Sequence, residues 1–153
     1  MYTIRKIYKV EYAHQLKSAY SACCHETIHG HSGIIEVFLS SEHLDKNEMV
    51  IDFGEVSVLI KKYLMDTFDH ALIIPDLFDK EYIECLKKYN KKLLIVTNNP
   101  TAESFCENIY YQLKIILQPI IDKYSDFKIQ KIRFHETETG YAEYDGETSS
   151  ERY

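Results

Sequence analysis

The chain of 153 residues carries a formal net charge of −6, with 45% hydrophobic and 27% charged residues. This length suits a single domain with its own core, so we expect one domain over residues 1–153. The acidic balance and the lack of a Lys/Arg stripe argue against nucleic-acid binding, and the apolar runs are far shorter than the ~20 residues of a membrane span. The first residues lack the apolar core of a signal peptide, so a cytoplasmic location is the simplest expectation, with free thiols at the four cysteines.

The first third of the chain predicts two strands and a helix. Residues 2–14 are rich in β-forming residues and alternate imperfectly, and residues 33–40 have the same character. A polar connection joins the two segments. Asp52 then has capping-box spacing with Glu55, and apolar residues follow at helical intervals. We therefore expect a first helix over residues 53–67.

The middle of the chain predicts two further helices with a short strand between them. Residues 79–89 suit a short helix, and the apolar run over residues 93–96 is strand-like. Pro100 and Thr101 begin a long helical pattern. Pro119 is expected to kink or end this helix, because proline cannot donate the helical hydrogen bond.

The end of the chain predicts a second pair of strands, over residues 127–136 and 140–144, and a frayed tail of about nine residues. Strands and helices do not alternate along the chain, which argues against a doubly wound parallel sheet. We expect an α+β fold in which an antiparallel four-stranded sheet carries two main helices on one face. The free edges of such a sheet are usually paired or covered, so we also expect a homo-oligomer.

Three histidines carry the strongest chemical signal. His29 and His31 are two residues apart, so an extended strand points both imidazoles to the same face. His14 ends the neighbouring strand, and adjacent antiparallel strands would bring all three imidazoles around one point. Scattered histidines are usually ordinary polar residues, but this pattern is typical of a catalytic zinc site with three His ligands and an open fourth position. We therefore predict that His14, His29 and His31 bind Zn²⁺.

The connection before His29 holds candidate bases for such a metal site. Cys23 and Glu26 lie six and three residues before His29, close enough in the chain to fold over the same metal. A cysteine beside zinc and imidazoles can lose its proton and act as a base or nucleophile, and a carboxylate can serve instead. The simpler interpretation of Cys23 and Cys24 is that they are small buried residues or extra metal ligands. We predict a catalytic role for at least one of Cys23 and Glu26.

Two other places attract attention on chemical grounds. Asp69 precedes His70, and an Asp beside a His can orient it in a proton relay, although neighbours in sequence do not automatically meet. Glu136 ends an apolar strand, where a carboxylate is costly without a partner such as the guanidine-like edge of a ligand. The simpler interpretation of Glu136 is a strand-end residue that reaches solvent.

Together these segments resemble one known family. The chain is similar to the 6-pyruvoyl-tetrahydropterin synthases and to their bacterial relatives, the 6-carboxytetrahydropterin synthases of the queuosine pathway. Each match alone is weak, but the set occurs in the family's order and spans nearly the whole chain. The matching stretches are EYAHQL (11–16), HGH (29–31), VIDF (50–53), DH (69–70), PTAE (100–103) and HET (135–137).

The resemblance implies a tunnelling-type fold whose trimers pair into hexamers around a sheet-lined barrel, with pockets between subunits. It also implies that zinc at the three histidines assists proton shifts and loss of triphosphate from 7,8-dihydroneopterin triphosphate. His70, oriented by Asp69, would act in proton transfer with the thiolate base. Glu136 would anchor the 2-amino/N3 edge of the pterin and belong to the relay, and Thr101 and Glu103 would line the pterin pocket.

The segment before HGH combines features of several family variants. Queuosine-type members usually have Cys four residues before the first His of HGH, where this chain has His25. Pyruvoyl-type members have Cys six residues before, which Cys23 matches. A third variant has Glu three residues before, which Glu26 matches, and resembles enzymes that form 6-hydroxymethyl-dihydropterin for folate synthesis. The product therefore stays open between a pyruvoyl, a carboxy and a hydroxymethyl pterin.

A second hypothesis is a non-catalytic zinc- or pterin-binding oligomer that kept the scaffold without turnover. The complete set of three histidines, Asp69, His70 and Glu136 favours the enzyme.

Overall fold

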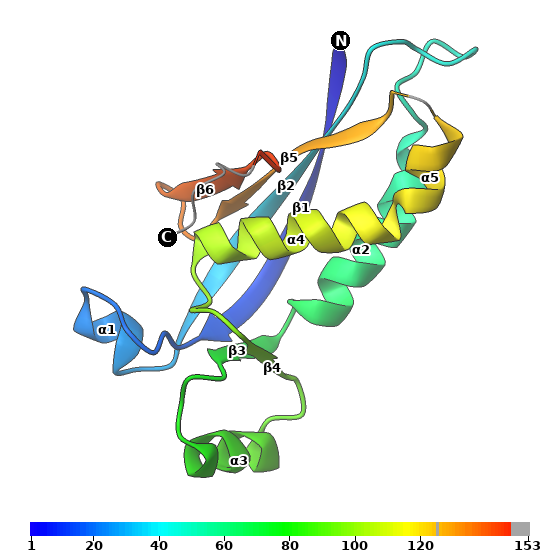
Figure 1. Ribbon diagram of the computed structural model, residues 1–153. Coiled ribbons are helices and arrows are strands. Elements are labelled where there is room, and N and C mark those ends of the chain that lie inside the picture. Colours follow the sequence, from blue (N-terminus) through cyan, green and yellow to red (C-terminus); the bar gives the residue numbers. More distant parts are fainter. Residues whose placement is uncertain (125, 148–153) are drawn as a thin grey trace.

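The computed structural model describes residues 1–124 and 126–147, so part of the tail predicted to fray lies outside the described residues. The described chain forms one mixed sheet in the strand order β4-β3-β1-β2-β5-β6, with helices α2 and α4 against one face (Figure 1). This confirms the α+β class and the helix-covered face. The expectation of a four-stranded antiparallel sheet is wrong, because the sheet has six strands and two of them join it in parallel.

The strands are β1 Tyr2–His14, β2 His29–Ser41, β3 Ala71–Pro75, β4 Leu93–Val96, β5 Lys128–His135 and β6 Tyr141–Tyr144. The helices are α1 Ala22–His25, α2 Phe53–Thr67, α3 Lys80–Tyr89, α4 Ala102–Ile116 and α5 Gln118–Lys123.

The β1–β2 pair is the centre of the sheet. The two strands pair antiparallel without a bulge, from Tyr2 opposite Ser41 to His14 opposite His29. The second strand is therefore longer than predicted and already begins at His29. Because side chains alternate along a strand, one set of positions faces the helices and the other faces away.

The strand missing from the sequence prediction is β3. It pairs in parallel with the end of β1 and with β4, and all five of its residues are buried. A parallel strand buried on both faces reads as a continuous apolar run and not as an alternation. The run ALIIP therefore lacked the period-two pattern that identified the other strands.

The two long helices begin as the sequence predicts. The Asp52 side chain caps α2 by accepting a hydrogen bond from the Gly54 amide at 2.6 Å. Glu55 does not complete a capping box and instead pairs with Lys123 at 3.1 Å. Thr101 caps α4 through the Ser104 amide, and α4 ends before the short helix that contains Pro119.

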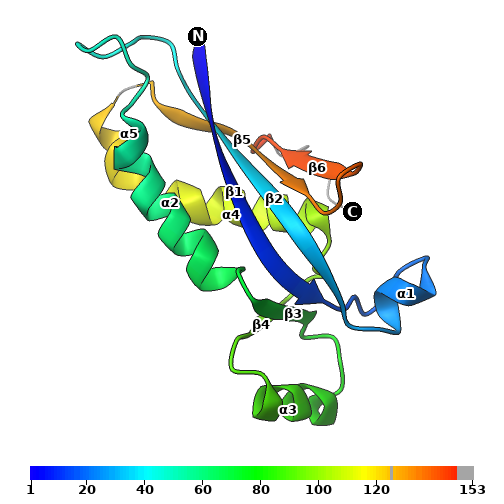
Figure 2. The ribbon, with the colours of Figure 1, turned by 180° about the vertical axis from the view of Figure 1, so that it is seen from behind.

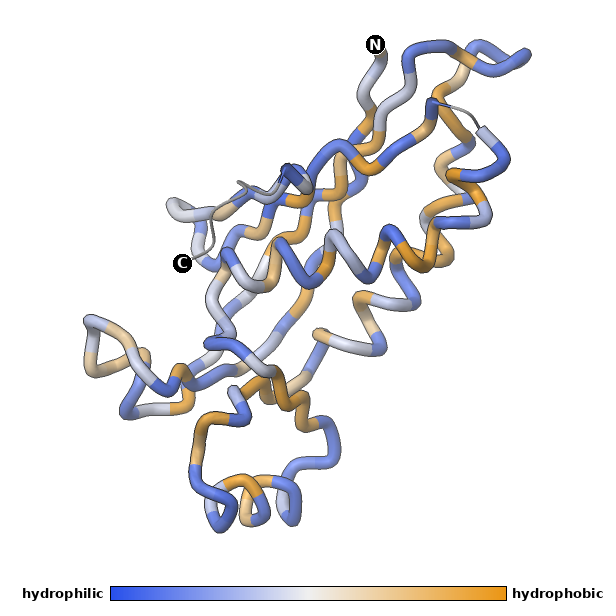
Figure 3. The backbone as a smooth tube through the Cα atoms, in the orientation of Figure 1, coloured by the Kyte–Doolittle hydropathy of each residue, from blue (hydrophilic) through white to orange (hydrophobic). Residues whose placement is uncertain are grey.

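The core lies between the sheet and the helices α2 and α4. Apolar residues gather on the strands and on the helix faces toward them, and polar residues dominate α3 and the loops (Figure 3). Within the described residues, no helix combines the length and apolarity needed to cross a membrane. The largest fully buried side chains are Phe105, Phe134, Ile35, Leu39, Ile60, Leu64, Ile73, Ile74, Ile109, Leu113, Leu117 and Ile132.

No helix of the described chain covers the opposite face of the sheet (Figure 2), and charged side chains meet there. At its centre Glu36, only 7% exposed at its side chain, accepts hydrogen bonds from Arg5 at 3.0 Å and from His135 at 2.8 Å. Arg133 lies 3.9 Å away. Burial alone would raise the pKa of Glu36, but these hydrogen bonds lower it below its usual value. We call Glu36, Arg5, Arg133 and His135 the Glu36 cluster.

Several strand edges are unpaired within the described residues. The strand β3 pairs with β1 only from Tyr12 to His14, and Asp69 and His70 bond the backbone of Glu11, so the edge of β1 over residues 2–10 has no neighbouring strand there. The strands β4 and β6 form the two borders of the sheet. Such edges are free to pair with another chain.

Candidate metal site and its surroundings

The three predicted histidines meet on the helix-covered face. His14 and His29 form the last pair of the β1–β2 ladder, and His31 follows two positions along β2. One ring nitrogen from each histidine lies within 4.8 Å of the others. His14 is buried, and the other two are partly buried. The antiparallel pairing therefore brings together imidazoles that are far apart in sequence.

The hydrogen bonds around these rings fit a bound cation. Nδ1 of His14 lies 2.8 Å from the Pro100 carbonyl, and Nδ1 of His29 lies 3.1 Å from the Thr27 carbonyl. A carbonyl only accepts, so both Nδ1 atoms carry the proton and both Nε2 atoms present lone pairs. These Nε2 atoms face each other at 2.9 Å, and Nε2 of His31 is buried without a partner. Three converging imidazole lone pairs suit a divalent metal such as zinc.

The charge state of His14 supports this interpretation. Burial is the main cause that lowers the pKa of His14 to about 4. The hydrogen bond to the Pro100 carbonyl raises this pKa, and the charges of His29 and His31 lower it further. Burial also lowers the pKa of His31, although Glu136 acts in the opposite direction. A proton is therefore disfavoured on His14 and His31, and neutral imidazole is the form that binds metals.

A cavity of about 560 Å³ opens beside the histidines. Glu136 follows β5 on the helix-covered side, with Oε1 3.7 Å from Nε2 of His14 and 4.0 Å from Nε2 of His31. Thr101 and Glu103, at the start of α4, also line the cavity. The structure thus brings the predicted metal ligands and the predicted pterin-pocket residues to one place.

Cys23 and Cys24 border the same cavity from α1. Cys23 is exposed, and its Sγ lies 2.9 Å from Oγ of Ser21 and 3.9 Å from Sγ of Cys24. The hydrogen bonds with Ser21 and Cys24 lower the pKa of Cys23, while burial and the neighbouring Cys23 raise that of Cys24. Cys23 is therefore the more acidic of the two thiols. All four cysteines of the chain are free, as predicted.

Glu26, the other predicted base, does not border this cavity. It is the C-cap residue of α1, and its exposed carboxylate lies 3.7 Å from Nε2 of His25. It is not among the residues that line the cavity beside the histidines. Of the two predicted bases, the structure therefore places Cys23 at the cavity and leaves Glu26 outside it.

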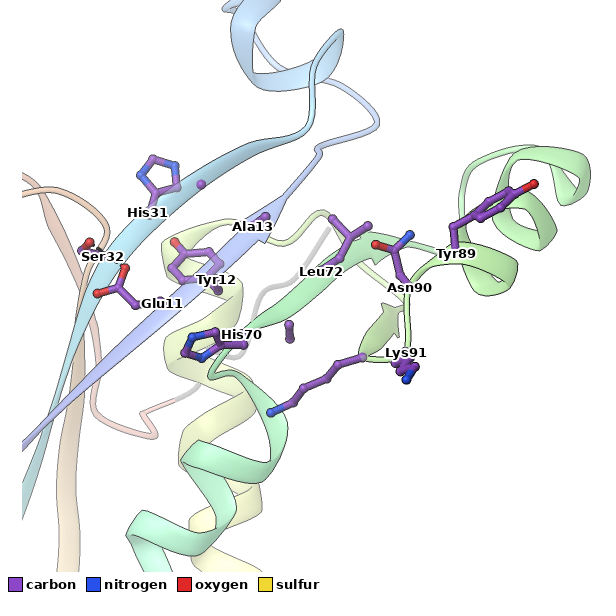
Figure 4. Close-up of a pocket in the computed structure, with 13 residues that line it drawn as sticks. Glu11, Tyr12, Ala13, His31, Ser32, His70, Leu72, Tyr89, Asn90 and Lys91 are labelled. Atoms are coloured by element: carbon purple, nitrogen blue, oxygen red, sulfur yellow. Dashed lines mark hydrogen bonds between the residues drawn. The ribbon is translucent and has the colours of Figure 1, made fainter.

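Asp69 and His70 do not join the three histidines within one chain. Oδ2 of Asp69 lies 2.9 Å from Nδ1 of His70, and Oδ1 of Asp69 accepts a hydrogen bond from the Glu11 amide at 3.0 Å. His70 has a positive φ of 57° and is largely exposed. It lines a second hollow, of about 670 Å³, with outward-facing Glu11 and Ser32 and with Tyr89, and His31 borders both this hollow and the cavity beside the histidines (Figure 4). The predicted Asp–His contact is thus present, but it faces a different hollow.

Two supporting features of the metal site were missed from the sequence. The Pro100 carbonyl, which fixes the His14 ring, belongs to the segment predicted as a turn and a helix start and matched as PTAE, and none of these predictions indicated a contact with His14. Tyr12 contacts the rings of His14 and His31 but reads in the sequence as one more strand residue. A backbone carbonyl leaves no sequence signal, whereas the position of Tyr12 two residues before His14 places it on the same strand face.

Comparison with known proteins agrees with this arrangement. The sequence profile of the family described as 6-pyruvoyl tetrahydropterin synthase matches residues 3–147. The 6-carboxy-5,6,7,8-tetrahydropterin synthase of Helicobacter pylori strain J99 is 32% identical over 142 residues, covering 92% of this chain and 70% of that protein. The protein of the same name from Haemophilus influenzae is 31% identical over 149 residues, covering 94% and 99%. The solved structure of Caenorhabditis elegans 6-pyruvoyl tetrahydropterin synthase shares the fold, with a TM-score of 0.67 and 22% identity, covering 95% of this chain and 96% of that chain.

The profile match and these relatives thus define an enzyme of the tetrahydropterin synthases, and the α+β fold and the histidine cluster beside a cavity agree with that class. The chain belongs to the 6-pyruvoyl tetrahydropterin synthase family.

Proposed function

We propose that the protein is a zinc-dependent lyase or synthase that acts on 7,8-dihydroneopterin triphosphate. The observation that carries this proposal is the convergence of three imidazole lone pairs on a cavity that also holds Cys23 and Glu136. Zinc bound by His14, His29 and His31 would act as a Lewis acid that polarises the oxygens of the substrate side chain. Family membership supplies the substrate class.

The chain's own residues would divide the remaining work. The Cys23 thiolate, favoured by its hydrogen bonds with Ser21 and Cys24, would accept a proton from a side-chain carbon of the substrate. The Glu136 carboxylate would accept hydrogen bonds from the 2-amino and N3 groups of the pterin and hold the ring in place. Thr101 and Glu103 would border the bound pterin, because they line the same cavity.

For the product, the related 6-carboxy synthases favour a carboxy pterin, and Cys23 at the cavity favours proton abstraction by a thiolate. Side-chain cleavage to 6-hydroxymethyl-7,8-dihydropterin by Glu26 is the second candidate. It rests on the family variant with Glu three residues before HGH, which Glu26 matches, and the cavity lining within one chain does not include Glu26.

We further propose that His70 acts in a site formed between copies of the chain. His70 lines a hollow that shares only His31 with the cavity beside the histidines, and Cys23 and Glu136 line only that cavity, so one chain does not bring His70 together with these two residues. Unpaired edges of β1 and β6 offer a route to a trimer or hexamer. The oligomer and the cytoplasmic location remain predictions.

The direct test is to incubate zinc-loaded protein with 7,8-dihydroneopterin triphosphate and to determine the pterin products by mass spectrometry. We expect turnover, with the mass distinguishing the carboxy, pyruvoyl and hydroxymethyl products. The Cys23→Ala variant should lose the elimination product, and Glu26→Ala should retain it. No turnover of this substrate would favour the non-catalytic binding oligomer.

A mixing experiment tests the shared site. The variants Cys23→Ala and His70→Ala, each inactive alone, are co-expressed with different tags so that they assemble together. If the two residues act across subunits, about a quarter of the interfaces in a random mixture carry both intact residues, and activity returns. Mixing Cys23→Ala with His31→Ala is the control, because both changes fall in the same half of the site and no intact site can form. Absence of recovery in the first mixture would contradict the proposal.

A further inference from the structure

Tyr12 is the aromatic residue packed against the histidine cluster. It lies opposite His31 in the β1–β2 ladder, and its ring centroid is 5.4 Å from that of His14 and 5.6 Å from that of His31. Phe105 and Phe134 enclose the other sides at 5.6 and 5.7 Å. Tyr12 is only 4% exposed. The ring therefore supports two of the three predicted ligands from the protein interior.

The hydroxyl of Tyr12 is buried without a hydrogen-bond partner. A phenylalanine would pack in the same place without this cost, since an unpaired buried hydroxyl lowers stability. The neighbouring strand also makes room for the ring, because a Cβ at Gly33 would lie only 3.0 Å from Cε1 of Tyr12. The chain thus retains a polar group where packing alone does not need one.

Glu136 approaches the same two imidazoles as Tyr12. Its carboxylate lies 3.7 Å from Nε2 of His14 and 4.0 Å from Nε2 of His31. The ring of Tyr12 and the carboxylate of Glu136 therefore contact the same pair of imidazoles, and the Tyr12 hydroxyl has no other hydrogen-bond partner. A carboxylate only accepts, so a hydrogen bond between the two groups has the hydroxyl as its donor.

We propose that Tyr12 is a positioning residue of the metal site. Its ring holds the imidazoles of His14 and His31, and its hydroxyl donates a hydrogen bond to the Glu136 carboxylate when the site is loaded. The inference rests on the proposed metal binding, but it does not depend on the identity of the pterin product. Groups that orient metal ligands from behind contribute to metal affinity without touching the metal.

The test compares two tyrosines of the same strand. Tyr8 lies on the same face of β1, and its hydroxyl is also buried without a partner, but it faces Ser57 of α2 and not the histidines. Zinc affinity of the metal-depleted protein is measured by competition with a chromogenic chelator. We expect Tyr12→Phe to weaken zinc binding about tenfold, the lower end of the range for outer groups, and Tyr8→Phe to leave it unchanged.

A double-mutant cycle tests the route through Glu136. If the hydroxyl acts on this carboxylate, Tyr12→Phe should weaken zinc binding far less in a Glu136→Gln background than in the wild type. Equal zinc affinity of Tyr12→Phe and wild type, or strictly additive effects in the cycle, would overturn the proposal. Failure of the wild type to bind zinc would overturn the proposed function as well, whereas zinc binding without a Tyr12 effect would overturn only this inference.

Discussion

The two faces of the β1–β2 pair bury polar groups in opposite ways. On the helix-covered face, His14, His29 and His31 bring lone pairs together with no positive charge between them. On the other face, Glu36 is surrounded by the cations and donors of the Glu36 cluster. Buried charges and dipoles are tolerated when a partner compensates them. The Glu36 cluster is complete within the chain, whereas the proposed metal would complete the histidine cluster.

Removal of a ligand should produce the largest effect. His31→Ala deletes one of three metal-binding nitrogens, and we expect zinc affinity to fall by more than about 100-fold, beyond the loss typical of outer groups. Circular dichroism should show an unchanged fold, because His31 lies at the cavity and not in the apolar core. His43→Ala is the control, since His43 is 85% exposed at its side chain and pairs with Asp126 elsewhere. Unfolding of His31→Ala would point to a structural metal.

Loss of Glu36 should act on stability and leave zinc binding intact. Glu36→Ala leaves Arg5, Arg133 and His135 without their shared anion, and we expect a loss of about 2–3 kcal/mol in the free energy of unfolding. This is less than for a fully buried pair because Arg5 is half exposed. Urea denaturation measures the loss, with Glu84→Ala as the control, because Glu84 is an exposed carboxylate of α3 that pairs with Lys87 away from the cluster. A change in zinc affinity would show that the two faces are coupled.

The same carboxylate gives a pH signature. Burial would raise the pKa of Glu36, but hydrogen bonds from His135 and Arg5 keep it below the usual 4.5. The unfolded chain therefore binds more protons than the folded one at low pH, so this stabilisation is fully present above about pH 4.5 and is lost below it. The stability difference between the wild type and Glu36→Gln should stay constant above pH 4.5 and shrink on further acidification. A difference that grows on acidification would contradict this assignment.

A smaller effect is expected at the rim of the histidine cavity. Ser21→Ala removes the hydroxyl 2.9 Å from Sγ of Cys23, so the pKa of this thiol should rise. We expect alkylation of Cys23 by iodoacetamide at neutral pH to slow about two- to fivefold, because the thiolate is the reactive form. Mass spectrometry follows the reaction, and the exposed Cys85 serves as the internal control. An unchanged rate at Cys23 would remove Ser21 from the site.

The sequence predicted those parts of the fold that have local patterns. Helix α2 and the strand β4 have the predicted bounds, and Asp52 caps its helix. The parallel strand β3 was missed, because its partners lie in other segments and its own sequence does not alternate. Glu55 shows the same limit on a smaller scale, since its tertiary partner Lys123 wins over the local capping box.

In the candidate site, too, the local spacing of residues was predictable, and contacts that depend on the fold were not. The spacing of His29 and His31, with His14 at the end of the paired strand, was sufficient to predict the cluster. The sequence could not decide which of Cys23 and Glu26 borders the cavity, because both are close to His29 along the chain. The path of α1 in the structure brings Cys23, and not Glu26, to the cavity. Nor could it place His70, whose hollow depends on a left-handed backbone turn between α2 and β3.

The thirteen-residue ladder of β1 and β2 has a consequence for folding. A slip of one residue would turn His29 and His31 to the opposite face, away from His14, because strand side chains alternate. A metal present while the hairpin forms would therefore bind only the correct alignment and select it over its neighbours. The same ion that serves chemistry would then act as a check on strand register during folding.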